Sequence, residues 1–264
     1  MQQIRTLGRQ VFELGTVQFL WGNPHVGAIF DTLGIEPTRG YFVLRAAPMG
    51  RPAPALIGNA FAFFPPVMVA KLVSRSWDEH LPSEVVALAV PHLAEAARSV
   101  FGDGEAVRDL AEHLAAVRAA GRYDGRMLSS AWNALRWPDD AAPTLFAAAT
   151  VLREHRGDGH ILALQRFDLS PLEGMLLSTS RRQEDIVAAA RSRGWRDDDL
   201  EEATARLVRR GAVADGVITD GGAELWEAVE RATDRLAAQP WRSSGVDLDE
   251  VVALAAQVID TARW

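Results

Sequence analysis

Two histidines and an aspartate lie close together in the sequence, at His155, Asp158 and His160. A histidine changes its charge near neutral pH and a neighbouring carboxylate can orient its ring, so these residue types fit acid–base catalysis. Spaced as His-x-x-Asp-x-His, the same side chains are also ligands that Zn²⁺ or Fe²⁺ accept. The adjacent Arg153 and Glu154 could contact a ligand. The segment 152–160 is therefore a candidate catalytic or ligand-binding site and, as a weaker alternative, a metal site.

This segment is flanked by the apolar stretches 143–151 and 161–164, both typical of helix interior. We expect an elbow between two helices close to the core, with Gly157 and Gly159 supplying backbone angles that other residues rarely adopt. A charge near a low-dielectric core has to be paired or used, because an isolated one costs several kcal/mol. The same side chains could equally form a network of ion pairs that joins two helices without any ligand.

A second candidate site combines aromatic side chains with a few polar groups, a composition typical of small-molecule pockets. Arg45, four residues after Tyr41, could hold a ligand carboxylate in a bidentate contact. Packing in an ordinary core would explain the aromatic residues equally well. The residues expected to line this pocket are His25, Tyr41, Arg45, Asn59, Phe61, Phe63 and Trp132, together with Arg153 and Glu154.

Composition narrows the possible functions of these sites. The chain has 264 residues, no cysteine and a formal net charge of −7. Disulfides, thiolate metal sites and cysteine nucleophiles are thereby excluded, and a reducing cytoplasm is the expected compartment. Excess negative charge works against nonspecific attraction to nucleic acid or to an anionic membrane. The most apolar run, 56–73, is interrupted by Asn59, two prolines and Lys71, so we expect no membrane-spanning segment.

Apolar residues recur at spacings of three and four almost throughout, which predicts a mainly helical, all-α chain. We expect an all-helical domain with the pocket at 1–166, a winged-helix domain at 167–241 and an amphipathic C-terminal helix at 242–264. Long amphipathic C-terminal helices commonly serve dimers, so a homodimer is expected. The expected helices are 4–21, 26–33, 55–64, 67–77, 82–101, 105–119, 127–135, a helix from 143 into the elbow, 183–192, 197–210, 223–238 and 247–263, with a linker at 240–245.

The second half carries the signals of a winged helix. Ser170, Pro171 and Glu173 form a capping-box start, and Asp215-Gly216 between β-branched residues indicates a tight hairpin. Over residues 169–238 this order resembles the winged helix-turn-helix of MarR-type regulators. In such a domain, the start of the helix before the wing reads DNA bases. Here the segment 197–202 holds five carboxylates, which would repel phosphates, so specific binding of duplex DNA is disfavoured although not excluded.

Further motifs span most of the chain, and they are Tyr41-Phe-x-x-Arg45-Ala-Ala-Pro48-x-Gly50, Phe61-x-Phe63 followed by Pro65, Gly121-Arg122, the segment Leu152–His160, Arg193-Gly-Trp195, Arg210-Gly211, Thr219-x-x-Gly222 and Glu230-x-x-Thr233-Asp234. With these motifs the chain resembles the actinobacterial SalK-like helix-turn-helix proteins. The resemblance implies an all-helical first half followed by a winged helix. It implies no established reaction, and it does not indicate which cofactor, if any, is bound.

Three functional hypotheses follow from these patterns. The first is a cytoplasmic small-molecule-binding protein on a winged-helix scaffold, acting as a ligand-responsive regulator or accessory factor. The second is an enzyme that acts on a small organic metabolite through His155 or His160, with Asp158 as the orienting carboxylate. The third is a metal protein that uses the same three side chains as ligands.

Overall fold

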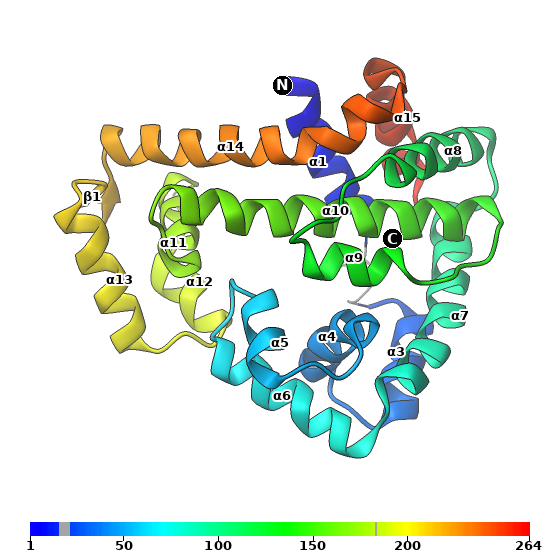
Figure 1. The fold of residues 1–264 in the computed structure, drawn as a ribbon, viewed down its shortest axis with the longest axis horizontal. Coiled ribbons are helices and arrows are strands. Elements are labelled where there is room, and N and C mark those ends of the chain that lie inside the picture. The colour runs from blue at the N-terminus through cyan, green and yellow to red at the C-terminus, as the bar shows by residue number, and fades with distance from the viewer. Residues whose placement is uncertain (16–21, 183) are drawn as a thin grey trace. The chain divides into compact units, whose positions relative to one another are not determined.

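The structure is a computed structural model, and it describes residues 1–15, 22–182 and 184–264. The described chain is mainly helical, with one small two-stranded sheet, which confirms the predicted all-α class (Figure 1). The elements are α1 (Gln2–Leu14), α3 (Pro24–Leu33), α4 (Pro37–Ala46), the 3₁₀ helix η1 (Ala47–Met49), α5 (Pro54–Ala60), α6 (Pro66–Glu79), α7 (Pro82–Phe101), α8 (Glu105–Ala119), α9 (Met127–Asn133), α10 (Ala141–Arg166), α11 (Pro171–Arg181), α12 (Ile186–Ser192), α13 (Asp197–Arg209), β1 (Val213–Ala214), β2 (Val217–Ile218), α14 (Asp220–Ser244) and α15 (Leu248–Thr261).

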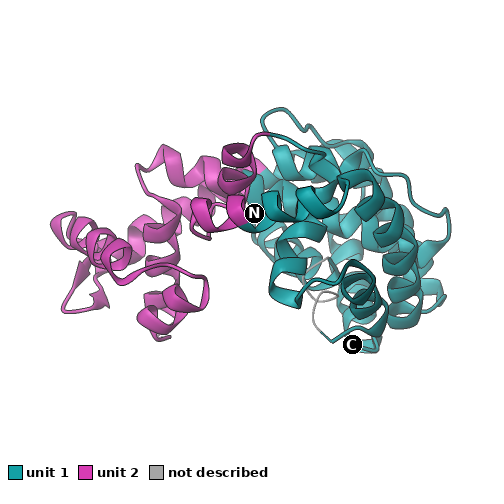
Figure 2. Ribbon diagram, turned by 90° about the horizontal axis from the view of Figure 1, so that it is seen from below, with its two compact units in different colours: residues 1–52, 72–158, 237–264 teal, residues 53–71, 159–236 magenta. Residues whose placement is uncertain are grey.

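The chain divides into two compact units (Figure 2). Unit 1 contains residues 1–52, 72–158 and 237–264, and unit 2 contains residues 53–71 and 159–236. The division therefore falls within helices α6, α10 and α14. Whether 1–166, 167–241 and 242–264 fold as separate domains stays a prediction. No helix in the described ranges combines the length and the apolar character needed to cross a membrane.

Unit 1 is a bundle of helices whose ends follow the local sequence signals. Proline opens α3, α4 and α7, where its missing N–H and fixed φ suit the first helical turn. Gly34 ends α3 in the left-handed conformation, with φ of 61°. Helix α15 packs on α1 and α8, and α7 packs on α3 and η1. The final helix thus covers its apolar face with its own chain.

Unit 2 holds the predicted winged helix. Helix α11 begins with the predicted capping box, in which the Ser170 hydroxyl accepts a hydrogen bond from the Glu173 backbone N–H and the Glu173 carboxylate accepts one from the Ser170 N–H. Helices α12 and α13 lead into antiparallel β1 and β2, joined by Asp215 and Gly216 at φ of 48° and 78°. Two successive residues with positive φ are typical of a type I′ hairpin turn. Buried Leu172, Leu176 and Leu207 lie in the core of this unit.

The step from the wing into α14 depends on a close backbone approach. The Thr219 hydroxyl donates to the Gly211 carbonyl at 2.6 Å and accepts the Gly222 N–H at 3.0 Å. A Cβ atom at Gly222 would lie 2.0 Å from the Ala212 carbonyl oxygen, so any larger residue would clash with backbone. The motif Thr219-x-x-Gly222 is therefore a requirement of this junction.

The predicted elbow at 152–160 is wrong, because α10 runs without a break from Ala141 to Arg166 (Figure 1). Gly157 and Gly159 lie inside this helix and have no positive φ. A glycine inside a helix costs only about 1 kcal/mol relative to alanine. Alanine, leucine, arginine and glutamate on either side favour the helix, and their burial outweighs that cost.

Other helix boundaries also differ from the expectation: α4 (Pro37–Ala46) was not expected, and α5 ends at Ala60. The expected linker at 240–245 is mostly helix, since α14 continues to Ser244 with Pro240 inside it. Buried Ala237, Ala238 and Trp241 hold this last part of α14 in the core. Helix α1 ends at Leu14, and the rest of the predicted helix 4–21 lies mainly outside the described residues.

The continuity of α10 can be tested by replacing Gly157 with alanine. Gly157→Ala should stabilise the protein by about 0.5–1 kcal/mol, because alanine favours helix and the nearest atom to its Cβ would be a Glu154 oxygen at 4.0 Å. Gly34→Ala, at φ of 61°, is the matched control and should destabilise the protein. Urea denaturation measures both effects. A destabilised Gly157→Ala variant would mean that residue 157 is not in a regular helix.

Candidate functional site

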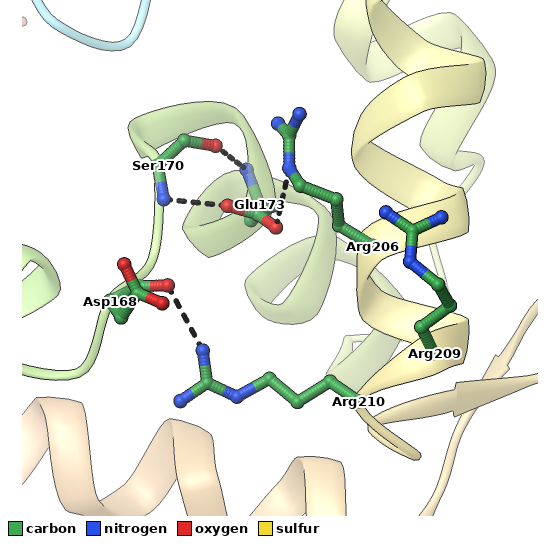
Figure 3. A pocket seen from close by; sticks show the side chains of 6 residues that line it. All are labelled: Asp168, Ser170, Glu173, Arg206, Arg209 and Arg210. Carbon is green, nitrogen blue, oxygen red and sulfur yellow. Dashed lines mark hydrogen bonds and ion pairs between the residues drawn. The ribbon is translucent and has the colours of Figure 1, made fainter.

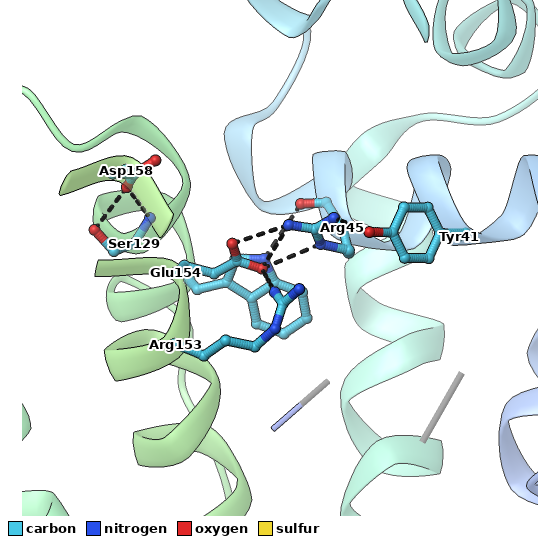
Figure 4. Close-up of polar contacts among 7 residues, drawn as sticks. Tyr41, Arg45, Ser129, Arg153, Glu154 and Asp158 are labelled. Atoms are coloured by element: carbon cyan, nitrogen blue, oxygen red, sulfur yellow. Dashed lines mark hydrogen bonds and ion pairs between the residues drawn. The ribbon is translucent and has the colours of Figure 1, made fainter. Parts of the chain in front are cut away.

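The centre of the candidate site is a buried ion pair between α4 and α10 (Figure 4). Glu154 accepts hydrogen bonds from Arg45 Nε at 3.1 Å and from Arg45 Nη2 at 2.9 and 3.0 Å. Both side chains are almost fully buried, at 7% and 3% exposure. Burial acts against the charged carboxyl, but Arg153 and Arg45 together lower the pKa of Glu154 below its usual value. The fork-to-fork contact predicted for Arg45 and a ligand carboxylate is thus made with Glu154 of the same chain.

A second guanidinium shares the same carboxylate. Arg153 Nη1 donates to Glu154 Oε1 at 2.5 Å, and the guanidinium carbon lies 5.1 Å from the centroid of the Phe12 ring. Burial lowers the pKa of Arg153, and the nearby charge of Arg45 acts in the same direction. Within the part of the chain that the structure describes, its buried Nε has no hydrogen-bond partner. One carboxylate therefore serves two buried guanidiniums, and one of them retains an unmet donor.

Aromatic side chains hold Arg45 in place. Its guanidinium donates to the Tyr41 hydroxyl, and its backbone carbonyl accepts a hydrogen bond from Trp132 Nε1 at 3.2 Å. The Trp132 ring is buried and stacks on Trp137 at 6.4 Å between centroids. Tyr41, Arg45, Trp132, Arg153 and Glu154 are accordingly brought together in unit 1. Their role in binding a ligand stays a prediction.

Asp158 lies one turn beyond Glu154 on α10 but has a different partner. Its Oδ2 accepts the backbone N–H of Ser129 at 3.0 Å and the Ser129 hydroxyl at 2.9 Å. Burial raises the pKa of Asp158 to about 6, and the hydrogen bonds from Ser129 only partly oppose this effect. Ser129 could not be identified as this partner from sequence patterns, since the two residues are 29 positions apart.

His155 is held by backbone groups of the segment before α9. Its Nε2 lies 3.1 Å from the Arg122 carbonyl oxygen, and its ring meets the edge of Tyr123 at 5.8 Å. Its own carbonyl accepts a hydrogen bond from Arg126. Burial, reinforced by the charge of Arg126, lowers the pKa of His155 to about 4. The ring is therefore neutral at pH 7.

His160 belongs to unit 2, where it lies among Phe63, Trp226 and Thr233. The ring stacks on Phe63 at 5.7 Å and meets Trp226 edge-on at 5.6 Å. Its Nδ1 lies 2.7 Å from the Thr233 hydroxyl, which itself donates to the Val229 carbonyl. Nδ1 therefore donates to Thr233. Glu230 Oε1 lies 3.7 Å from the same nitrogen.

The contacts of His155, Asp158 and His160 do not form the expected catalytic pair or metal cluster. On a continuous helix, residues two positions apart do not face each other, so His160 and Asp158 point in different directions. His155 and Asp158 each bond to other groups. Among the described residues, no three His, Asp or Glu side chains are grouped so that they could hold a metal ion.

The other predicted pocket residues lie in different places. His25 is in α3 of unit 1, and its backbone N–H bonds to the Asn23 side chain at 3.0 Å. Asn59 is exposed on α5 of unit 2, while Phe61 is buried and Phe63 is half-buried in the same unit. A ligand role for these four residues stays a prediction.

Helix α13 presents carboxylates where a winged helix would read DNA. The exposed side chains of its first turns include Asp197, Asp198, Glu201 and Glu202. The nearby arginines are neutralised by ion pairs, as in Arg191–Asp197 at 2.9 Å and Arg196–Asp199 at 3.2 Å. These two arginines are therefore held by carboxylates that compete with the phosphate contacts on which DNA binding depends.

A family model described as a helix-turn-helix family matches residues 5–263, nearly the whole chain. The match includes residues of both compact units. No curated protein and no solved structure matches this chain.

The pKa shifts of Asp158 and His155 have opposite directions, so they predict two opposing effects of pH on the free energy of unfolding. The carboxyl of Asp158 has its pKa raised from 3.8 to about 6 in the folded protein. This shift contributes about 3 kcal/mol of stability at low pH, and the contribution is lost as pH rises through 6. Lowering the imidazole pKa from 6.5 to about 4 penalises the folded state at low pH, and that penalty disappears as pH rises to 6.5. The two contributions offset each other in the unmodified protein.

Replacing either residue should expose the contribution of the other. In Asp158→Asn, whose amide oxygen can still accept from Ser129, the free energy of unfolding relative to that of the unmodified protein should rise by about 2 kcal/mol between pH 4 and 6.5. In His155→Gln the relative value should fall over the same range. Urea denaturation at several pH values measures both. Two variants whose profiles run parallel to that of the unmodified protein would contradict the assigned shifts.

Proposed function

The chain belongs to a helix-turn-helix family, and from this premise we propose that it is a cytoplasmic small-molecule-binding protein on a winged-helix scaffold. It would act as a ligand-responsive regulator or an accessory factor. The resemblance to SalK-like proteins and to the MarR-type winged helix is part of this proposal. So is the homodimer, for which α15 offers limited support because its apolar face already packs on α1 and α8.

The observation that carries the proposal is the unmet donor of Arg153. Its Nε is buried and has no hydrogen-bond partner among the described residues, beside a carboxylate that Arg45 already holds. A buried donor without an acceptor costs about 1–3 kcal/mol, and more where the group is charged. The segment 16–21, outside the described residues, contains no acidic side chain that could supply a counter-charge. A small organic anion would provide both an acceptor and a compensating charge.

The chemistry of the surrounding residues indicates the kind of anion. Tyr41 contributes a phenol beside Arg45, and Phe12 contributes a ring beside Arg153. A carboxylate attached to an apolar or aromatic group would satisfy the guanidinium and contact these rings. The enzyme hypothesis lacks comparable support, because His155 and Asp158 do not contact each other in the way that an oriented base requires.

We also propose that the winged helix of this protein does not read duplex DNA through α13. The support is the row of carboxylates at the start of α13 and the pairing of the arginines around it. Asp215 at the tip of the wing adds another negative charge. The domain would instead serve as a packing or interaction module.

Anion binding at Arg153 can be tested with benzoate as the probe. Benzoate at a hundred times its Kd should stabilise the protein by about 2.7 kcal/mol, which corresponds to a rise in Tm of roughly 5–10 °C. Arg153→Met should abolish this rise without loss of stability, because it removes a buried charge and leaves Glu154 paired with Arg45. Arg75→Met, at an arginine that is 73% exposed, is the matched control and should keep the response. A chloride solution of equal ionic strength giving the same rise would refute the proposal.

DNA binding can be tested by a mobility-shift assay at low salt with random duplexes. The unmodified protein should give no shift. A variant with Asp197→Asn, Asp198→Asn, Glu201→Gln and Glu202→Gln should acquire weak, salt-sensitive binding, because it frees Arg191 and removes the repulsion of phosphates. A salt-dependent shift by the unmodified protein would show that the winged helix contacts duplex DNA despite its charge.

A further inference from the structure

Unit 2 contains a polar cavity that lies outside the residues discussed above for ligand binding (Figure 3). It has a volume of about 470 Å³ and lies between the end of α13 and the residues that lead into α11. This volume is in the range of small-molecule sites. The lining residues are Asp168, Ser170, Glu173, Arg206, Arg209 and Arg210. All six are polar or charged, so the cavity suits a highly polar ligand.

One carboxylate of the cavity is already neutralised. Glu173 accepts the Ser170 backbone N–H at 2.7 Å and pairs with Arg206 Nε at 3.1 Å. Its side chain is 7% exposed, so this pair is part of the wall of the cavity. Arg206 also pairs with Glu202 at 2.6 Å, which fixes its guanidinium from a second side. Arg206 and Glu173 therefore shape the site and do not contribute a net charge to it.

The other two arginines keep their positive charge available. Arg210 donates to the carbonyls of Phe167 at 2.6 Å and of Asp168 at 3.0 Å, neither of which carries a formal charge. These bonds use two of the five N–H donors of a guanidinium and hold the group at the cavity. Arg209 makes no hydrogen bond or ion pair with any residue that the structure describes. Two adjacent cations thus face the cavity without a carboxylate bound to either.

The opposite wall offers groups that recognise hydroxyls. Asp168 has a φ of 52°, and its backbone carbonyl is the one bound by Arg210. Its carboxylate lines the cavity and can accept hydrogen bonds from a ligand. The Ser170 hydroxyl accepts from the Glu173 N–H, so its own hydrogen remains available to a ligand oxygen. Cations on one side and a carboxylate with a hydroxyl on the other fit a molecule with an anionic end and a hydroxylated end.

We propose that this cavity binds a small phosphorylated polyol, with the phosphate on Arg209 and Arg210 and the hydroxyl groups on Asp168 and Ser170. Paired guanidiniums match the geometry of phosphate oxygens through parallel N–H donors. None of the six lining residues is an aromatic or aliphatic residue, so the cavity suits a polar ligand better than a planar aromatic one. The site is separate from the proposed anion site at Arg153, which belongs to unit 1.

Isothermal titration of the full chain with glycerol 3-phosphate, inorganic phosphate and glycerol tests the proposal. Glycerol 3-phosphate should bind more tightly than phosphate, glycerol alone should not bind, and both affinities should fall as salt is raised. Arg209→Ala should weaken the binding of both phosphates at least tenfold. It should not disturb folding, since Arg209 has no partner in the described part of the chain.

Two further variants separate a specific site from general surface charge. Asp168→Asn keeps a residue that tolerates positive φ, and should remove the advantage of glycerol 3-phosphate over phosphate without weakening phosphate itself. Arg231→Ala changes an exposed arginine on α14 and should leave all affinities unchanged. The proposal is overturned if the unmodified protein binds neither phosphate, or if Arg209→Ala and Arg231→Ala lower the affinity equally. Because Arg153→Met should not alter this titration, failure here is distinct from failure of the anion site in unit 1.

Discussion

The shared carboxylate of Glu154 is the interaction on which unit 1 depends most. Removing one partner of a buried ion pair costs about 3–5 kcal/mol, because the other charge is left in a low-dielectric surrounding. Glu154 is contacted by both Arg45 and Arg153, so its loss would leave two charges unpaired. The Arg45–Glu154 contact joins α4 to α10, and the bond from Trp132 to the backbone carbonyl of Arg45 joins α4 to α9. A single carboxylate therefore determines both the packing of this region and its electrostatic character.

Much of the fold could be predicted because helix ends are determined by local chemistry. Helix α8 has the predicted bounds, α7 begins at Pro82 as expected, and the capping box at Ser170 and the hairpin at Asp215 are present. The errors arose where tertiary packing overrides a local signal. Gly157 and Pro240 both sit inside long helices whose flanks are buried or strongly helix-forming. Helix propensity assigns an unfavourable free energy to a glycine or proline inside a helix. It does not include the favourable free energy of burying the flanking residues, which is larger here.

The sequence singled out several polar residues as candidates for ligand binding, but it did not indicate which of them contact each other. Arg45, Tyr41, Arg153 and Glu154 were expected near a ligand, and the structure brings them together. That Arg45 would bind Glu154, 109 positions away, depends on how α4 packs on α10. The partner of Asp158 is likewise set by the position of α9. The arginines of the polar cavity were visible in the sequence as late residues of α13, but only the fold brings them opposite Asp168 and Ser170.

The junction between wing and α14 has a mechanical consequence. With the Thr219 hydroxyl bridging two backbone segments and Gly222 pressed against the Ala212 carbonyl, the hairpin cannot swivel about the first turn of α14 without breaking both contacts. The hairpin and the first turn of α14 therefore form one rigid element. A rotation of the first turn of α14 would thus carry the hairpin with it.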